Sequence, residues 1–111
     1  MPLDFTEDRA LAALAAIGNP TRLAILRALV KAGPDGLAAS ALAQAVGATP
    51  SRASFHLSTM AEAGLLSSER EARQITYRLD FESLGGLIRY LVEDCCGSHP
   101  TLCGCAGKAC C

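Results

Sequence analysis

The residues of this sequence that are best suited to chemistry are its cysteines. The chain has six cysteines among 111 residues, and all of them follow position 94. They are Cys95, Cys96, Cys103, Cys105, Cys110 and Cys111. The first 94 residues must fold without a thiol, which excludes a disulfide framework distributed through the fold. In a reducing compartment, clustered thiols bind a soft ion or carry out redox chemistry more often than they form structural disulfides.

The rest of the composition is that of a small globular domain. Half of the residues are apolar, 19% are charged and the formal net charge is −1, which excludes a disordered chain and a strongly basic protein that coats polyanions. The length is that of about one domain and leaves no room for a separate catalytic domain. There is no signal-peptide pattern and no run of roughly 18–20 apolar residues. We therefore expect a cytoplasmic protein that does not contact a membrane.

Caps and apolar spacing predict four helices in the first part of the chain. A Thr or Asn that can cap a helix precedes three of them, proline follows the cap in two, and glycine ends the segments. The helices are expected to run from Thr6 to about Ile17, from Asn19 to Gly33, from Ala39 to Val46 and from Thr49 to about Gly64.

A two-residue period follows Leu66. Ile75, Tyr77 and Leu79 alternate with polar residues, which indicates a half-buried strand. The segment 65–70 can supply its antiparallel partner, with the hairpin tip at 71–73.

The helical period returns near Glu82 and continues as far as Cys95. This spacing predicts a last helix that carries Cys95 on its apolar edge and stops at Gly97 and Pro100. We therefore expect one folded domain over residues 1–96 and a flexible cysteine-rich tail over 97–111.

The order helix, helix, helix-turn-helix, hairpin, helix is the layout of a winged helix-turn-helix domain. The expected fold is mainly α with a small β-hairpin. On the fourth helix, Ala53, Leu57, Met60 and Ala61 share the side that would pack on the preceding helices. The outward side carries mostly small hydroxyl side chains and Arg52, which can approach phosphates and base edges in a major groove. An ordinary amphipathic surface helix would show the same pattern.

The charge distribution favours a site-specific contact with DNA over a non-specific one. Residues 49–79 hold four arginines against three glutamates, a balance of +1, whereas residues 80–111 balance at −2. Because the predicted helix and hairpin are only weakly basic, non-specific DNA affinity should be weak, and a DNA role requires a preferred site and a dimer.

Four motifs occur in order along the chain: Asn19-Pro-Thr-Arg-Leu-Ala-Ile-Leu, Ser40-Ala-Leu-Ala-Gln-Ala-Val-Gly, Thr49-Pro-Ser-Arg-Ala-Ser-Phe-His-Leu and Gly64-Leu-Leu. Together they closely resemble the ArsR/SmtB family of dimeric winged-helix metalloregulators, over about residues 6–95. The resemblance implies that the fourth helix binds double-stranded operator DNA, that the wing contacts phosphate or the minor groove, and that the first and last helices build a homodimer.

The resemblance also implies which residues face the DNA. On the recognition helix the matching positions are Ser51, Arg52, Ser54 and His56. For the wing we add Arg70, Arg73 and Gln74. His56 has an alternative role, a hydrogen bond within the domain, and Arg22 is expected to make a structural or backbone-phosphate contact.

The family's best-known inducer site is missing here. Its arsenic sensors carry a Cys-x-Cys-type box on the helix before the recognition helix, and the corresponding segment 40–46 has no cysteine. Residues 80–94 contain no histidine, and their acidic residues alone are poor ligands for a soft ion.

The tail thiols are the remaining donors. Three thiolates suit a pyramidal As(III) or Sb(III) centre, whereas structural Zn(II) takes four ligands. Cys95 and Cys96 at the helix end can hold one side of the ion, and we expect Cys103 to return as the third ligand, with Cys105 as its alternative. This site is similar to that of the minority of ArsR proteins that sense trivalent arsenic at the end of the last helix.

The sequence thus predicts a repressor that leaves its operator when As(III) or Sb(III) binds, without a catalytic cofactor. A redox or persulfide switch in the same thiols is the main alternative. Cd(II), Pb(II), Zn(II) or an organoarsenical are alternative inducers, and a metal buffer without DNA binding is another class. A thiol-dependent arsenate reductase is disfavoured because there is no Cys-x5-Arg phosphate loop and no preorganised pocket around the thiols.

Overall fold

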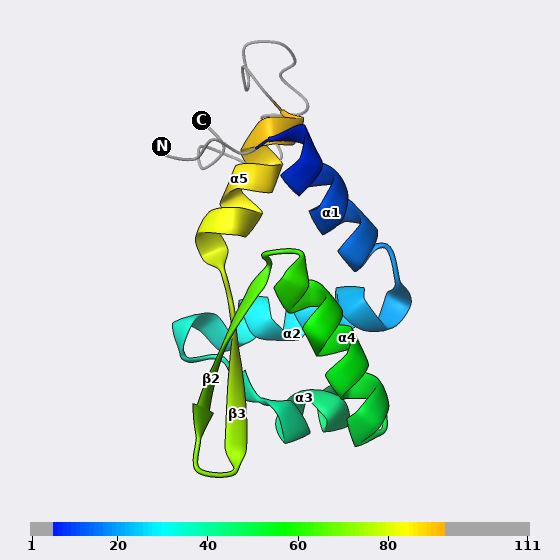
Figure 1. The fold of residues 1–111 in the computed structure, drawn as a ribbon, viewed down its shortest axis with the longest axis vertical. Helices are drawn as coiled ribbons and strands as arrows, with labels where there is room; N and C mark the ends of the chain where they lie inside the picture. The colour runs from blue at the N-terminus through cyan, green and yellow to red at the C-terminus, as the bar shows by residue number, and fades with distance from the viewer. Residues whose placement is uncertain (1–5, 93–111) are drawn as a thin grey trace.

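The computed structural model describes residues 6–92, which form five α-helices and a small sheet (Figure 1). The helices are α1 (Glu7–Ile17), α2 (Pro20–Ala32), α3 (Ala39–Val46), α4 (Pro50–Glu62) and α5 (Phe81–Leu91). The strands are β1 (Leu37–Ala38), β2 (Leu66–Glu71) and β3 (Gln74–Leu79), and a 3-10 turn, η1 (Gly33–Asp35), precedes β1. The order of helices and hairpin is the one that the sequence predicts.

The predicted helix starts are confirmed by their caps. The side chain of Thr6 accepts from the backbone N–H of Arg9, and that of Asn19 accepts from Thr21. Thr49 accepts from the N–H of Arg52 at 3.2 Å. Each bond satisfies an N–H group that has no partner within the helix.

The sheet has one strand more than the sequence predicts. Its order is β1-β3-β2 and both pairings are antiparallel, with Leu37 opposite Tyr77 and Leu66 opposite Leu79. The expected tip is also one residue too long, because Glu71 still pairs with Gln74. The hairpin therefore turns through two residues, of which Ala72 has a positive φ of 55°.

Most of the core side chains come from helices, as expected for a domain with so small a sheet. The largest fully buried side chains are Ile25, Leu29, Leu42, Leu57, Met60 and Leu65. They belong to one cluster that also takes in three alanines of α1, Leu79 of β3 and Leu87 of α5. This shared core fixes α4 and the sheet relative to the other helices.

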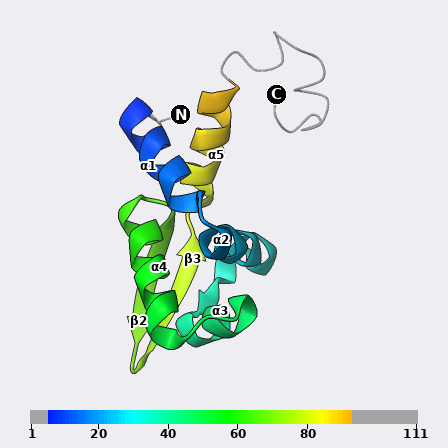
Figure 2. The same ribbon diagram turned by 90° about the vertical axis from the view of Figure 1, so that its right-hand side faces the viewer.

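The elements separate into two ends. Figures 1 and 2 both show α1 and α5 side by side at one end, while α3, α4 and the β2–β3 hairpin occupy the other. Among the described residues no single helix is long and apolar enough to cross a membrane. The segments Glu7–Ile17 and Pro20–Asp35 pass that test only as a pair, and they are bent by 103°.

The last helix is shorter than predicted. α5 ends at Leu91, and the N–H of its C-cap, Val92, bonds to the carbonyl of Ile88. The apolar spacing continues past Leu91, and the expectation that the last helix carries Cys95 on its apolar edge falls on a residue that the structure does not describe. Cys95 itself, like the division at residue 96, lies outside the described residues.

Candidate nucleic-acid interface

Helix α4 has one buried and one exposed face. Ala53, Leu57 and Met60 are buried, as predicted, and Ala61 is half-buried. After Pro50 in the first turn, the exposed side chains are Ser51, Arg52, Ser54, Phe55, Ser58 and Glu62. Three of the four residues expected to face DNA on this helix are thus free of the core, and the fourth, His56, is half-buried.

The turn between α3 and α4 fixes how the exposed face is presented. Gly47 ends α3 in the left-handed region, at φ 69° and ψ 32°, and its N–H contacts the carbonyls of Ala43 and Gln44. A glycine adopts this conformation without the steric cost that a Cβ would add. Thr49 then caps α4 and Pro50 occupies its first turn. The N-terminal half of α4 is thereby fixed beside α3.

The wing and α4 meet at a shared hollow. It measures about 620 Å³ and lies between α3, α4 and β3. Ser54 of α4 and Arg73 and Gln74 of the hairpin line it, together with Gln44 and Tyr77. The structure therefore brings together three residues that the sequence assigns to DNA contact from two separate segments.

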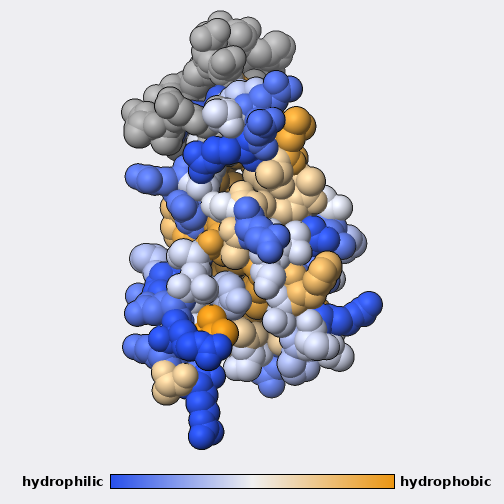
Figure 3. Space-filling model, viewed as in Figure 1, coloured by the Kyte–Doolittle hydropathy of each residue, from blue (hydrophilic) through white to orange (hydrophobic). Residues whose placement is uncertain are grey.

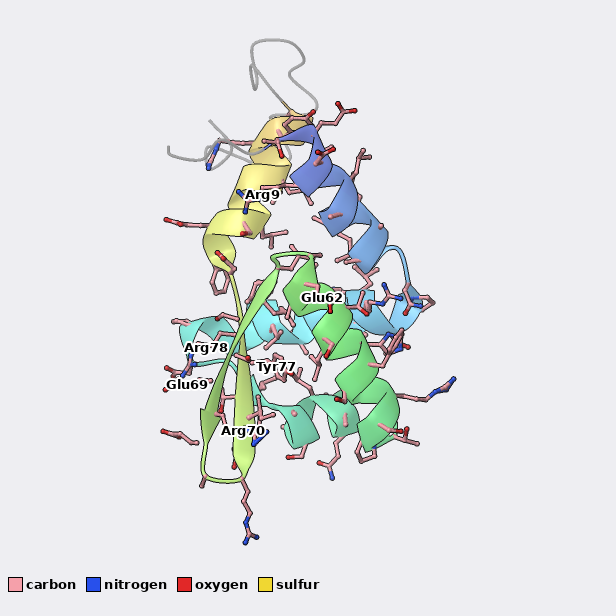
Figure 4. The ribbon with its side chains drawn as sticks, viewed as in Figure 1. Arg9, Glu62, Glu69, Arg70, Tyr77 and Arg78 are labelled. Carbon is pink, nitrogen blue, oxygen red and sulfur yellow. The ribbon has the colours of Figure 1, made fainter. Side chains whose placement is uncertain are left out.

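The arginines of the wing differ in their partners. Arg78 donates to Oε1 of Glu69 at 2.8 Å across the two strands, and Figure 4 shows this pair on the side of the hairpin. Arg70 and Arg73 are exposed, and neither forms an ion pair within residues 6–92. Figure 3 shows hydrophilic side chains gathered over the hairpin, whereas apolar side chains are exposed over α1. Cationic groups that lack an acidic partner remain available to phosphates.

His56 makes a hydrogen bond inside the domain. Its Nδ1 accepts from Nε of Arg22 at 3.2 Å, and a second guanidinium nitrogen of Arg22 donates to the carbonyl of Ala16 at 3.2 Å. Arg22 therefore joins the end of α1 to α4, and the structural role predicted for Arg22 is seen. The hydrogen bond within the domain, predicted as the alternative role of His56, is present.

The imidazole of His56 is biased towards its neutral form. Burial lowers the pKa of His56 below its usual value, and the charges of Arg22 and Arg52 lower it further. A neutral ring is required here, because only an unprotonated Nδ1 can accept the Arg22 hydrogen bond.

The predicted metal ligands are not described by the structure. Cys95, Cys96 and Cys103, and the alternatives Cys105, Cys110 and Cys111, all lie outside residues 6–92. Within that range no group of three or more His, Cys, Asp or Glu side chains is placed to hold a metal ion.

Sequence reasoning left out two features of the site. Phe55 is not among the residues that the sequence assigns to DNA contact, yet it is 63% exposed on the outward face of α4. The link from Arg22 to His56 spans 34 positions, and no local pattern signals such a pair. The sequence does contain a signal for Phe55, because an aromatic residue on an otherwise polar helix face is unusual and indicates a contact with a partner.

Known proteins share both the sequence pattern and the fold. A family model described as a helix-turn-helix domain matches residues 17–69. The HTH-type transcriptional regulator YgaV of Escherichia coli K12 is 34% identical over 94 residues, which cover 85% of this chain and 93% of YgaV.

Three solved structures superpose on most of the chain. NolR from Sinorhizobium fredii has a TM-score of 0.62 at 36% identity, and the match covers 79% of this chain and 85% of the NolR chain. The homodimeric winged helix-turn-helix DNA-binding domain of Mb0332 from Mycobacterium bovis, a possible ArsR-family regulator, has a TM-score of 0.62 at 28% identity, with coverages of 78% and 81%. The antimony-specific transcriptional repressor AntR has a TM-score of 0.63 at 30% identity, with coverages of 80% and 79%.

These likenesses confirm the winged helix-turn-helix fold that the order of elements predicts. They also agree with the exposed helix α4 and the wing beside it, which are the parts that such domains offer to DNA. The chain belongs to the ArsR-like family of winged helix-turn-helix transcriptional regulators, which are DNA-binding proteins and not enzymes.

Proposed function

We propose that this protein is a homodimeric repressor that leaves its operator when As(III) or Sb(III) binds thiolates following α5. The observation that carries the proposal is the position of the six cysteines, all of which follow α5, the helix that packs beside α1 at the end opposite the DNA-facing elements (Figure 2). The antimony-specific AntR, which shares this fold, supports the choice of ion class.

The DNA contact uses α4 and the wing. Ser51, Arg52 and Ser54 enter the major groove from α4, while Arg70, Arg73 and Gln74 contact the backbone beside it. The exposure of all six side chains supports this assignment. Small hydroxyl groups permit close approach to base edges, and the arginines supply the electrostatic part of the affinity.

The dimer is built from α1 and α5. Leu11 of α1 is 57% exposed, and Ile88 and Leu91 of α5 are 48% and 56% exposed. These apolar side chains lie on the two neighbouring helices that one protomer leaves uncovered, and apolar surface of this kind is favourably buried against a second copy. A two-fold axis there sets the separation of the two α4 helices, and hence the spacing of the half-sites.

The ion is held by Cys95, Cys96 and Cys103, with Cys105 as the alternative third ligand. Trivalent arsenic and antimony prefer soft thiolate donors, and two adjacent thiols followed by a third meet that preference with few residues. Binding joins these thiolates on one ion and shifts α5 against the dimer interface.

The described contacts supply a route from α5 to α4. A guanidinium nitrogen of Arg9 in α1 donates to Oγ of Ser83 in α5 at 3.3 Å, and Figure 4 shows Arg9 reaching towards that helix. Arg22 then joins the end of α1 to His56 of α4. A coupling free energy on the order of 1–3 kcal/mol along this route weakens operator binding by roughly 5- to 150-fold.

The test is operator binding of the full-length protein with and without arsenite. Fluorescence anisotropy should show that arsenite releases the operator DNA from the wild-type protein. The Cys95→Ser and Cys96→Ser variants should keep the operator bound after arsenite is added. Release from both variants would overturn the assignment of the thiols. Release by a mild oxidant or a persulfide donor, with none by arsenite, would instead identify a redox switch in the same cysteines.

A further inference from the structure

Phe55 is the most exposed large apolar side chain among residues 6–92. It is 63% exposed, and the next highest value, 57%, belongs to Leu11 of α1. Leu11 lies among other exposed apolar residues on α1 and α5, where a second protomer can cover it. Phe55 lies instead on the outward face of α4, at the other end of the molecule, so the proposed dimer interface does not explain it.

The ring of Phe55 is held by its neighbours. It packs edge to face against the imidazole of His56, with centroids 5.6 Å apart and an interplanar angle of 62°. His56 is in turn fixed by the 3.2 Å hydrogen bond from Arg22. The backbone carbonyl of Phe55 also accepts a hydrogen bond from the hydroxyl of Thr59 at 3.1 Å. An exposed aromatic ring held in this way loses little conformational freedom when it meets a partner.

Phe55 reaches further from α4 than the serines around it. Ser51, Ser54 and Ser58 share the exposed face of α4, and each has a much shorter side chain. When such a face enters a major groove, the phenyl ring reaches the base edges before the three serines do, while the longer Arg52 and Glu62 side chains on the same face end in charged groups. The base edges there offer hydrogen-bonding groups and one apolar group, the C5-methyl of thymine. An aromatic ring cannot satisfy the hydrogen-bonding groups, so its complement is the methyl.

We propose that Phe55 is a specificity-determining residue that reads a thymine methyl group in each operator half-site. The inference rests on the proposed operator binding by α4 and goes beyond it by naming the base that one side chain selects. Burial of one methyl group contributes roughly as much as a buried CH₂, which corresponds to about fourfold in affinity. A dimer that makes the contact twice should therefore lose about 15-fold when both methyl groups are removed.

The experiment begins with selection of binding sites from a random duplex DNA library by the full-length wild-type protein and by Phe55→Ala. The wild type should enrich a thymine at one symmetric position of each half-site, and the variant should lose this preference while it keeps the rest of the consensus. Circular dichroism and sedimentation check that the variant is folded and has the oligomeric state of the wild type. Because Phe55 is exposed, both properties should be retained.

The decisive step replaces that thymine by deoxyuridine, which lacks only the methyl group. Wild-type affinity should fall by about fourfold for one half-site and about 15-fold for both, while Phe55→Ala should bind both duplexes equally. Equal losses for the two proteins, or no loss for the wild type, would overturn the assignment of Phe55 and leave operator binding intact. If the wild type enriches no sequence at all, operator binding itself fails, and the assignment fails with it.

Discussion

Gly36 sets the distance between β1 and the wing, and its replacement by alanine should loosen the sheet. Gly33 and Gly36 have nearly the same backbone conformation, with φ 78° and ψ −160° at Gly33 and φ 71° and ψ −165° at Gly36. Only glycine adopts this region readily, so alanine is strained by about 1–3 kcal/mol at either position. Their surroundings differ, because a Cβ at Gly33 meets nothing within 4 Å.

At Gly36 the added methyl group has no room. It would overlap the backbone carbonyl oxygen of Tyr77 and lie 2.7 Å from Cγ of Arg78, well inside the ~3.5 Å of ordinary contact. The Arg78 side chain can move, but Tyr77 is fixed in the ladder opposite Leu37. Overpacking of this kind costs about 1–3 kcal/mol. Gly36→Ala should therefore destabilise the protein by about 1–3 kcal/mol more than Gly33→Ala.

Urea unfolding of both variants at one protein concentration measures this difference, and the equal concentration removes the effect of dimerisation. Hydrogen exchange should show faster exchange in β1 and β3 of Gly36→Ala and little change there in Gly33→Ala. Equal destabilisation of the two variants would refute the reasoning, because it would show that the close approach to Tyr77 contributes nothing.

The remaining predictions concern α4, the wing and α5. Because the pKa of His56 is lowered in the folded state, the unfolded chain binds the proton first. The stability gained from neutral His56 is complete above about pH 6.5 and falls as the pH drops through the lowered pKa. Thermal unfolding at stepped pH should show this loss of stability in the wild type and not in His56→Asn, whose side chain keeps an acceptor but does not titrate. If the stability of the two proteins fell in parallel with pH, the assignment of the loss to His56 would be wrong. Arg73→Ala should weaken binding to all DNA sequences and reduce the slope of log affinity against log salt by about 0.9 for each phosphate that the variant no longer neutralises, whereas Arg89→Ala on α5 should leave the slope unchanged. A Cβ at Gly85 meets nothing within 4 Å in the protomer, so Gly85→Ala should favour the helix by up to about 1 kcal/mol. The same substitution should weaken a dimer in which the two α5 helices approach each other at this residue. Sedimentation that shows an unchanged dimer would exclude such an approach.

Local chemistry explains why the helices were predictable. The caps at Thr6, Asn19 and Thr49 act within three residues of themselves, so the sequence shows each helix start directly. The apolar spacing on α4 likewise identifies its buried face. Strand β1 was missed because a segment of two residues is too short to show an alternation of apolar and polar side chains. Only its pairing with β3 makes it a strand.

Features that depend on distant residues were not predictable. The apolar spacing extends the last helix to Cys95, but α5 ends at Leu91, and spacing alone does not signal that end. The hydrogen bond from Arg22 fixes His56 within the domain, and these residues meet only because α2 and α4 share one core. The DNA-facing residues of α4 could be proposed because the motif that begins at Thr49 resembles the ArsR/SmtB family, whereas the shared hollow required the fold.

The most direct test of the thiol-triggered repressor follows operator release and arsenic ligation in one titration. Arsenite is added to the full-length protein on its selected duplex while DNA anisotropy and arsenic X-ray absorption are recorded. The account predicts that DNA release parallels the appearance of a three-sulfur arsenic centre. It also predicts that Cys95→Ser and Cys96→Ser lose both signals and that Cys103→Ser loses the third sulfur. Formation of the three-sulfur centre without release of the operator, or release without sulfur ligation, would contradict it.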